Sequence, residues 1–274
     1  MIPCMDTDDC RSALGRADLI MGAFDVAHPT LSLPGIAARV KLPRTSVRRT
    51  VQKLVDLGWL ERHDDRFAIG SRMFEIGGLS PVQNRLRATA LPHLEDLYEA
   101  THETVHLGVL MGSQVLYVEK LSGHRPATRL SRVGGRMPAH CTAIGKVLTA
   151  YSGPGAEVAL RHTGLPPRTP ATITSRMRLE SELRTIRGAG VAFDREECEN
   201  GLVCVAAPVR VGAGTPAAAI SVTAATGRVQ LTRMAAVVLA SAHRIARELA
   251  CADGRSAQRY SGVTSTGQPR LCTG

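Results

Sequence analysis

The chain has 274 residues, a formal net charge of +10 and 44% hydrophobic residues, which is typical of a folded protein with room for two domains. No apolar run is long enough to cross a membrane, and the acidic N-terminus lacks the basic and then apolar pattern of a signal peptide. We therefore expect a cytoplasmic protein whose seven scattered cysteines are reduced thiols.

The first part of the chain predicts three helices. Apolar residues at helical spacing indicate a helix over residues 12–27, and residues 33–60 predict two further helices joined by a tight turn. Pro43 separates this pair, because proline cannot continue a helix interior. The last helix is expected from about residue 44 to 57 and ends at Gly58. This is the arrangement of a helix-turn-helix.

The helix after the turn has a basic face that would point to solvent. Val47, Val51 and Leu54 repeat at helical spacing and would pack inward. In a helix-turn-helix this helix enters the DNA major groove, where arginine can bond guanine or clamp a phosphate. Residues 26–55 contain no Asp or Glu. The candidate DNA-binding residues are Arg44, Thr45, Ser46, Arg48, Arg49, Gln52, Lys53, Arg62 and Arg66.

Arg62 and Arg66 fall in a predicted hairpin with a turn at residues 63–65, which would form the wing of a winged helix-turn-helix. Two alternatives remain open: an amphipathic helix with a solvated basic face, and a ligand-binding module whose basic helix serves only protein contacts. Residues 1–80 hold 11 Lys/Arg against 10 Asp/Glu, so the DNA interpretation depends on where the charge clusters and not on the total.

The rest of the chain mixes antiparallel hairpins with helices, which indicates an α+β fold. A linker helix is expected over residues 71–79. Helices are then predicted at residues 86–101, 143–151, 175–187 and 229–250, and strands at 104–110, 115–118, 202–211 and 217–223. Residues 134–138 are expected to be a loop, and the Ser-, Gly- and Thr-rich tail from residue 253 to be disordered.

One motif indicates a different chemistry. His102-Glu103-Thr104-Val105-His106 spells HExxH, in which two histidines one helical turn apart bind zinc and the glutamate acts as base. Here the helix is expected to end near Thr101, and the next residues alternate as a strand does. This helix-to-strand junction argues against a zinc site, so we expect no metal or other cofactor. A zinc-dependent hydrolase remains the alternative function.

Four blocks of the chain resemble the IclR-type transcriptional regulators. They are LPRTSVRRTVQKLVDLGWLER (42–62), ETVHLGVLMGSQVLYVEKL (103–121), RVGGRMPAHCTAIGKVLTA (132–150) and GVAFDREECENGLVCVAAPV (190–209). Two positions depart from the family pattern: His102 stands where glycine is common, and Cys141-Thr142 replaces a small pair that contains alanine.

The resemblance implies a winged helix-turn-helix domain (residues 11–70), a linker helix (71–84) and a GAF-like effector-binding α+β domain (85–252). Residues 1–10 and 253–274 would be flexible ends. It also implies a homodimer or homotetramer that is not an enzyme. Its partners would be double-stranded operator DNA and a small-molecule effector, often a carboxylate.

The effector site is predicted at the start of the helix 143–151. Thr142 is a plausible N-cap, and the free N–H groups of a first helical turn suit a carboxylate. By position, Ala143, Ile144, Asp194 and Cys204 match the effector-contacting residues of the family, and Met137 and Leu202 match part of its apolar lining. The alternative is an ordinary helix start, with Asp194 a simple turn residue.

Overall fold

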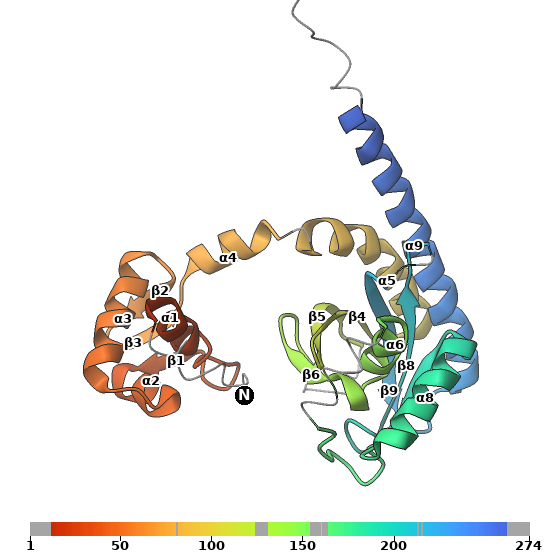
Figure 1. The fold of residues 1–274 in the computed structure, drawn as a ribbon, viewed down its shortest axis with the longest axis horizontal. Coiled ribbons are helices and arrows are strands. Elements are labelled where there is room, and N and C mark those ends of the chain that lie inside the picture. The colour runs from red at the N-terminus through yellow and green to blue at the C-terminus, as the bar shows by residue number, and fades with distance from the viewer. Residues whose placement is uncertain are drawn as a thin grey trace, which may run out of the picture. The chain divides into compact units, whose positions relative to one another are not determined.

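The computed structural model describes residues 12–80, 82–123, 131–153, 160, 164–212, 214 and 216–261 of the 274 residues. The chain divides into two compact units, residues 1–83 and 84–274, and each has its own hydrophobic core (Figure 1). Within the described ranges, no helix combines the length and the apolar character needed to cross a bilayer.

The N-terminal unit is a winged helix-turn-helix, as the sequence predicts (Figure 1). Its elements are α1 (Ala13–Met21), β1 (Thr30–Ser32), α2 (Leu33–Val40), α3 (Arg44–Asp56), β2 (Leu60–His63) and β3 (Arg66–Ile69). The antiparallel sheet has the order β1–β3–β2. The predicted hairpin therefore gains a third strand, β1, which is too short to show an alternating pattern in the sequence.

Two residues set the turn between α2 and α3. Lys41 adopts the left-handed conformation (φ 55°) and ends α2, and Pro43 stands at the N-cap of α3. Val47, Val51 and Leu54 on α3 are buried against α1, α2 and β2. The apolar face that periodicity predicts is thus the face that forms the core, and the basic face is left in solvent.

A helical segment connects the wing with the second unit. The helix α4 (Ser71–Gly78) follows β3 directly, and a turn of π-helix, η2 (Val82–Arg87), leads into α5 (Ala88–Thr101). The boundary between the two compact units falls inside η2, after residue 83.

The second unit is built on one antiparallel sheet of six strands. They are β4 (Thr104–Met111), β5 (Gln114–Leu121), β6 (Arg136–Pro138), β7 (Ala192–Arg195), β8 (Leu202–Val209) and β9 (Ala218–Ala225). The order β6–β5–β4–β9–β8–β7 places the first and last thirds of the unit side by side through the β4–β9 pair. Met111 pairs with Gln114, so Gly112-Ser113 is the predicted two-residue hairpin loop.

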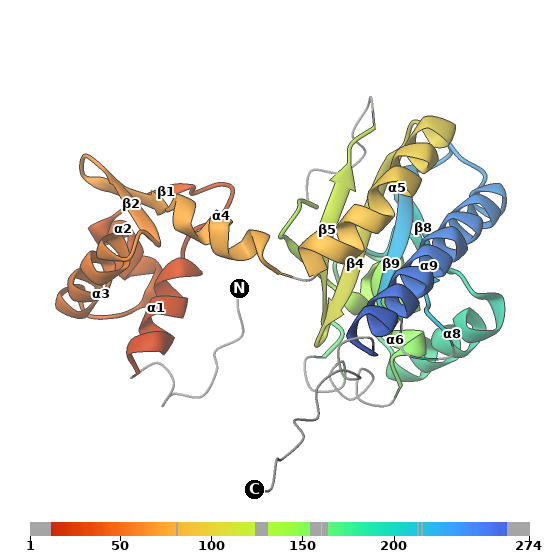
Figure 2. The same cartoon turned by 90° about the horizontal axis from the view of Figure 1, so that it is seen from above.

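Helices cover both faces of this sheet (Figure 2). The helices α5 and α9 (Leu231–Ser261) pack on one face, against alternate residues such as Val105, Leu107 and Val205. The helices α6 (Ala143–Tyr151) and α8 (Arg176–Ala189) pack on the other, against residues such as Val115 and Ala206. Both faces of the sheet are therefore buried, which gives the unit two cores. The arrangement is the α+β fold that the sequence predicts.

Two expectations for this unit are wrong. Residues 136–138 form the edge strand β6, which pairs with β5 (Leu116 with Arg136), although this Gly-rich stretch indicates a loop. The helix α9 continues to Ser261, so residues 253–261 are helical where composition indicates disorder. Alanine, arginine and glutamine in this stretch favour helix. The expected flexible N-terminus (residues 1–10) and the tail from 262 lie outside the described residues.

The start of α6 is held very close to the segment before it. A Cβ atom added to Gly145 would lie 2.3 Å from both Cα and the carbonyl oxygen of Ala139. No side-chain motion relieves a clash with backbone atoms, so this close approach requires glycine. Gly188, in the exposed part of α8, would instead meet nothing within 4 Å.

We predict opposite effects for two glycine-to-alanine changes. Gly145→Ala should destabilise the protein by about 3 kcal/mol or more, because the backbone must shift to admit the methyl group. Gly188→Ala should stabilise it by up to about 1 kcal/mol, since alanine favours a helix and no atom obstructs it. Urea unfolding followed by circular dichroism measures both changes. Equal midpoints for the two variants would show that the contact at Gly145 is not tight.

Candidate functional site

The predicted DNA-binding residues of α3 lie on one exposed surface. Thr45, Gln52 and the four cations of α3 are exposed, and Ser46 is half-buried. The cations Arg44, Arg48, Arg49 and Lys53 make no ion pair with any residue in the described ranges. Gln52 donates to Asp56 at 2.9 Å. The surface therefore carries positive charge that no ion pair within the described residues neutralises.

The two wing arginines are also exposed but make internal hydrogen bonds. Arg62 donates through Nε to the carbonyl of Asp64 at 2.8 Å. Arg66 donates to the Oγ1 and the carbonyl of Thr30 at 2.9 and 2.6 Å, which ties β3 to β1. These bonds orient both guanidinium groups along the wing and use part of their donors.

The six predicted effector residues surround one cavity in the second unit. Met137 comes from β6, Ala143 and Ile144 from α6, Asp194 from β7, and Leu202 and Cys204 from β8. The space among these residues that lies outside protein atoms is about 440 Å³, part of which is open to solvent. Sequence reasoning missed other lining residues: His106, Tyr117, Ser131, Cys198, Glu199, Ser221 and Thr223.

A pattern in the sequence does indicate some of the missed residues. Ser221 and Thr223 alternate with the apolar Ile220 and Val222 along β9, and His106 alternates in the same way on β4. Each of these polar side chains is buried. Polar residues at alternate positions of an otherwise apolar strand indicate that one face of the sheet borders a polar cavity.

The first turn of α6 contributes Ala143 and Ile144 to the cavity lining. Thr142 caps the helix: its Oγ1 accepts from the Gly145 N–H at 3.2 Å and donates to the Pro138 carbonyl at 3.0 Å. The N–H groups of Ala143 and Ile144 are the first two of the helix, which by geometry have no partner within it. They add the partial positive charge of a helix N-terminus to the cavity.

Asp194 is buried at the edge of the cavity and is held by backbone donors. Its Oδ1 accepts from the N–H of Glu197 at 2.7 Å and of Cys198 at 3.4 Å. Burial raises its pKa to about 7, although the Glu197 N–H and the Lys146 charge act in the opposite direction. The turn expected as the alternative begins only after Asp194, which itself lies in β7 and pairs with Cys204.

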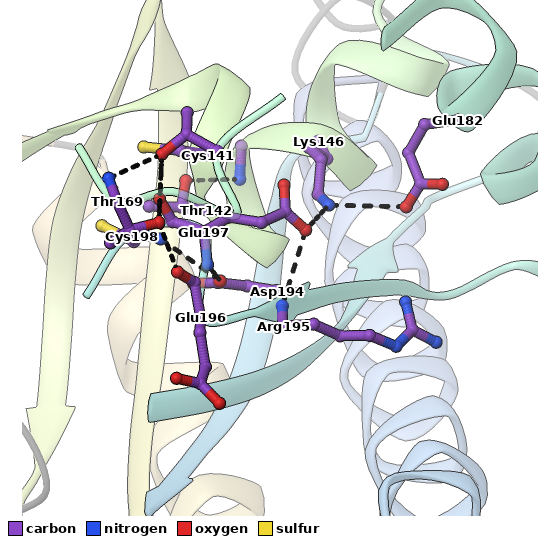
Figure 3. Close-up of polar contacts among 12 residues, drawn as sticks. Cys141, Thr142, Lys146, Thr169, Glu182, Asp194, Arg195, Glu196, Glu197 and Cys198 are labelled. Carbon is purple, nitrogen blue, oxygen red and sulfur yellow. Dashed lines mark hydrogen bonds and ion pairs between the residues drawn. The ribbon is translucent and has the colours of Figure 1, made fainter. Parts of the chain in front are cut away.

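A buried ion pair lies behind Asp194. The ammonium group of Lys146 on α6, which is fully buried, is 2.5 Å from Glu197 Oε1 and 3.4 Å from Glu182 Oε1. Figure 3 shows Lys146 between these two carboxylates, with Glu197 and Cys198 on the turn that follows Asp194. The pair therefore joins the helix that carries the free N–H groups to the turn that holds Asp194.

Neither Cys204 in the cavity lining nor Cys141, just before α6, is a nucleophile. A hydrogen bond to Cys198, together with burial, raises the pKa of Cys141 far above its ordinary value. Burial likewise raises the pKa of Cys204, whose sulfur is 3.1 Å from Thr223 Oγ1. Both thiols stay protonated at neutral pH, so Cys204 can only pack against a ligand or form a weak hydrogen bond with it.

The HExxH motif does not form a zinc-peptidase site. His102 is the C-cap of α5, with a left-handed backbone (φ 52°), whereas His106 lies in β4. The two histidines are thus not one turn apart on a helix, as that chemistry requires. Glu103 forms an ion pair with Arg228 at 3.2 Å. Across the described ranges, no three His, Cys, Asp or Glu side chains are grouped so that they could hold a metal ion.

The fold and the cavity define a class of protein, the DNA-binding regulators with a separate effector domain. Residues 13–64 match the IclR helix-turn-helix domain, and residues 82–250 match the bacterial transcriptional regulator IclR C-terminal domain. The chain belongs to the IclR family of bacterial transcription regulators and is not an enzyme.

Several known proteins are similar to it over most of their length. The transcriptional regulator XynR of Escherichia coli is 33% identical over 226 residues, which cover 80% of this chain and 88% of XynR. BhcR of Paracoccus denitrificans is 34% identical over 228 residues, which cover 82% of this chain and 81% of BhcR. An IclR homolog from Microbacterium hydrocarbonoxydans, crystallised with 4-hydroxybenzoate, superposes with a TM-score of 0.81 at 29% identity, covering 88% of this chain and 100% of that one.

We predict that removing one partner of the buried ion pair destabilises the protein more than removing both. Lys146→Met should destabilise the second unit by about 3–5 kcal/mol, because Glu197 is left charged in a buried site. The double variant Lys146→Met/Glu197→Gln should regain much of this loss, since neither member of the pair is then charged. Thermal unfolding of the parent and both variants gives the comparison. A double variant less stable than Lys146→Met would contradict the explanation.

Proposed function

We propose that the chain assembles as a homodimer or homotetramer and binds double-stranded operator DNA through α3 and the wing. The supporting observation is the row of exposed cations on α3, of which Arg48 and Arg49 point away from the core. In this architecture the helix after the turn enters the major groove, and the wing lies along the backbone. Two copies related by a two-fold axis would read a pseudo-palindromic site.

Arg48 and Arg49 are the residues on which this proposal is tested. Arg48→Ala or Arg49→Ala should weaken operator binding by about 1–3 kcal/mol where a bidentate base contact is lost, with relaxed specificity at one position. A lost phosphate contact should weaken all sequences alike and flatten the salt dependence. Fluorescence anisotropy with operator DNA at several salt concentrations distinguishes a lost base contact from a lost phosphate contact.

The matched control is Arg184→Ala, which removes the same charge from the exposed face of α8 in the other unit. It should leave both the affinity and its salt dependence unchanged. If the Arg48→Ala/Arg49→Ala double variant stays folded and binds as tightly as this control, α3 is not the DNA-reading helix.

We propose further that a small organic acid is the effector and binds in the cavity. The first-turn N–H groups of Ala143 and Ile144 suit a carboxylate, and Asp194, when protonated, can donate to it. The complex of the Microbacterium relative with 4-hydroxybenzoate, an aromatic acid, supports this ligand class. Such a ligand modulates DNA binding to the extent that its affinity differs between the DNA-competent and incompetent states.

This proposal predicts that the affinity for an acid falls as pH rises. Carboxylic acid ligands are ionised at neutral pH, so they bind best while Asp194 is still protonated. Above its pKa of about 7, Asp194 loses its donor proton and repels the ligand. The dissociation constant for 4-hydroxybenzoate should therefore rise by up to about tenfold per pH unit above 7. Calorimetry on the full chain at pH 6, 7 and 8 measures it.

Asp194→Asn is the control for the pH effect. Its amide is neutral at every pH and has nearly the shape of aspartic acid, so its carbonyl can still accept from the Glu197 N–H. Affinity should then be flat between pH 6 and 8. A slope that persists unchanged in this variant would assign the titration to another group.

A further inference from the structure

We infer that His106 is a specificity-determining residue of the cavity, and that its Nδ1 recognises a hydroxyl group on the acid. The inference deepens the proposed effector function and rests on it. It gives the ligand two polar ends, a carboxylate at the first turn of α6 and a hydroxyl at His106, and so defines the class as hydroxylated organic acids.

The imidazole of His106 is buried and fixed on one side. Its Nε2 lies 2.8 Å from Ser131 Oγ, and its ring stacks obliquely on Tyr117 with 4.9 Å between centroids. Ser131 is itself placed by Lys120, whose ammonium group donates to the Ser131 carbonyl at 2.7 Å. His106, Tyr117 and Ser131 all line the cavity. The ring therefore has a set position before any ligand arrives.

The other nitrogen of this ring is an unsatisfied polar atom. His106 Nδ1 is fully buried and has no hydrogen-bond partner among the residues that the structure describes. A buried polar atom without a partner costs about 1–3 kcal/mol, and such an atom in a cavity wall indicates a group supplied from outside the chain. The imidazole is 2% exposed, so bulk solvent does not satisfy it.

A hydroxyl is the group that fits this nitrogen. Burial lowers the pKa of His106 to about 3, so the ring is neutral, and Nδ1 accepts if Nε2 donates to Ser131 and donates if Nε2 accepts from it. A hydroxyl can do either in return. A second carboxylate would find no positive charge on the ring, and a methyl group would leave Nδ1 without a partner.

The spacing along β4 sets the length of the ligand. Ile144, at the start of α6, lies over Gly108: a Cβ added there would be 3.1 Å from Ile144 Cγ2. His106 is two residues from Gly108 on the same face of the strand, which is a distance of about 7 Å. The carboxylate and hydroxyl ends are thus separated by about the length of one substituted aromatic ring.

The test compares 4-hydroxybenzoate with benzoate on the full chain by calorimetry at pH 6.5. The two probes share the carboxylate and the ring and differ in the hydroxyl alone. The parent should bind 4-hydroxybenzoate about tenfold more tightly, as expected for one buried hydrogen bond. His106→Phe should bind both acids within about twofold of each other, because phenylalanine keeps the ring and removes both nitrogens. Its affinity for benzoate should stay near that of the parent.

A measurement on the unaltered protein guards against a variant that fails to fold. With histidine ring nitrogens labelled by ¹⁵N, 4-hydroxybenzoate should move the Nδ1 resonance of His106, assigned with His106→Gln, and benzoate should not. Equal affinity of the parent for both acids, or an unchanged preference in His106→Phe, would overturn the role of His106 and leave the effector site standing. If neither acid binds the parent, the proposed effector function fails, and the inference fails with it.

Discussion

The approach of α6 to the sheet is the constraint on which the effector domain depends. Gly145 lets the backbone of the helix meet the backbone at Ala139, and Gly108 leaves room beneath Ile144. These two contacts fix where the first turn of α6 lies, and hence where its unused N–H groups point. Larger side chains at either glycine would lift the helix, so the geometry of the cavity is set by the absence of two Cβ atoms.

Buried charge then fixes the opposite wall. Lys146 projects from the same helix and pairs with Glu197, whose backbone N–H holds Asp194. Thr172 adds a hydrogen bond to the Glu197 carbonyl at 2.6 Å. A buried pair of this kind contributes little net stability, but it disfavours arrangements in which either partner is alone. The start of α6 and the turn after β7 are therefore held in one relative position by charge as well as by packing.

How much of this the sequence predicts depends on the length of each pattern. The helix α3 spans more than three turns, so its buried Val47 and exposed Arg48 follow from periodicity. The strand β6 has three residues and no readable pattern. His106 drew attention only as part of HExxH, because one sequence does not show that Ser131 will lie beside it. His102, with its positive φ, explains why glycine suits that position.

Two titratable groups of the cavity bear on the proposed binding of a single anion in a buried site. Burial shifts both toward their neutral forms: it raises the pKa of Asp194 to about 7 and lowers that of His106 to about 3. Near pH 6, between these values, neither of these two side chains carries a full charge. In the proposed function, the charge of a bound carboxylate would meet the partial positive charge of the α6 N-terminus without facing a full charge on Asp194 or His106. In the proposed function, the site would separate two tasks: the helix would bind the anion, while His106 and Asp194 would distinguish one acid from another by their hydrogen bonds.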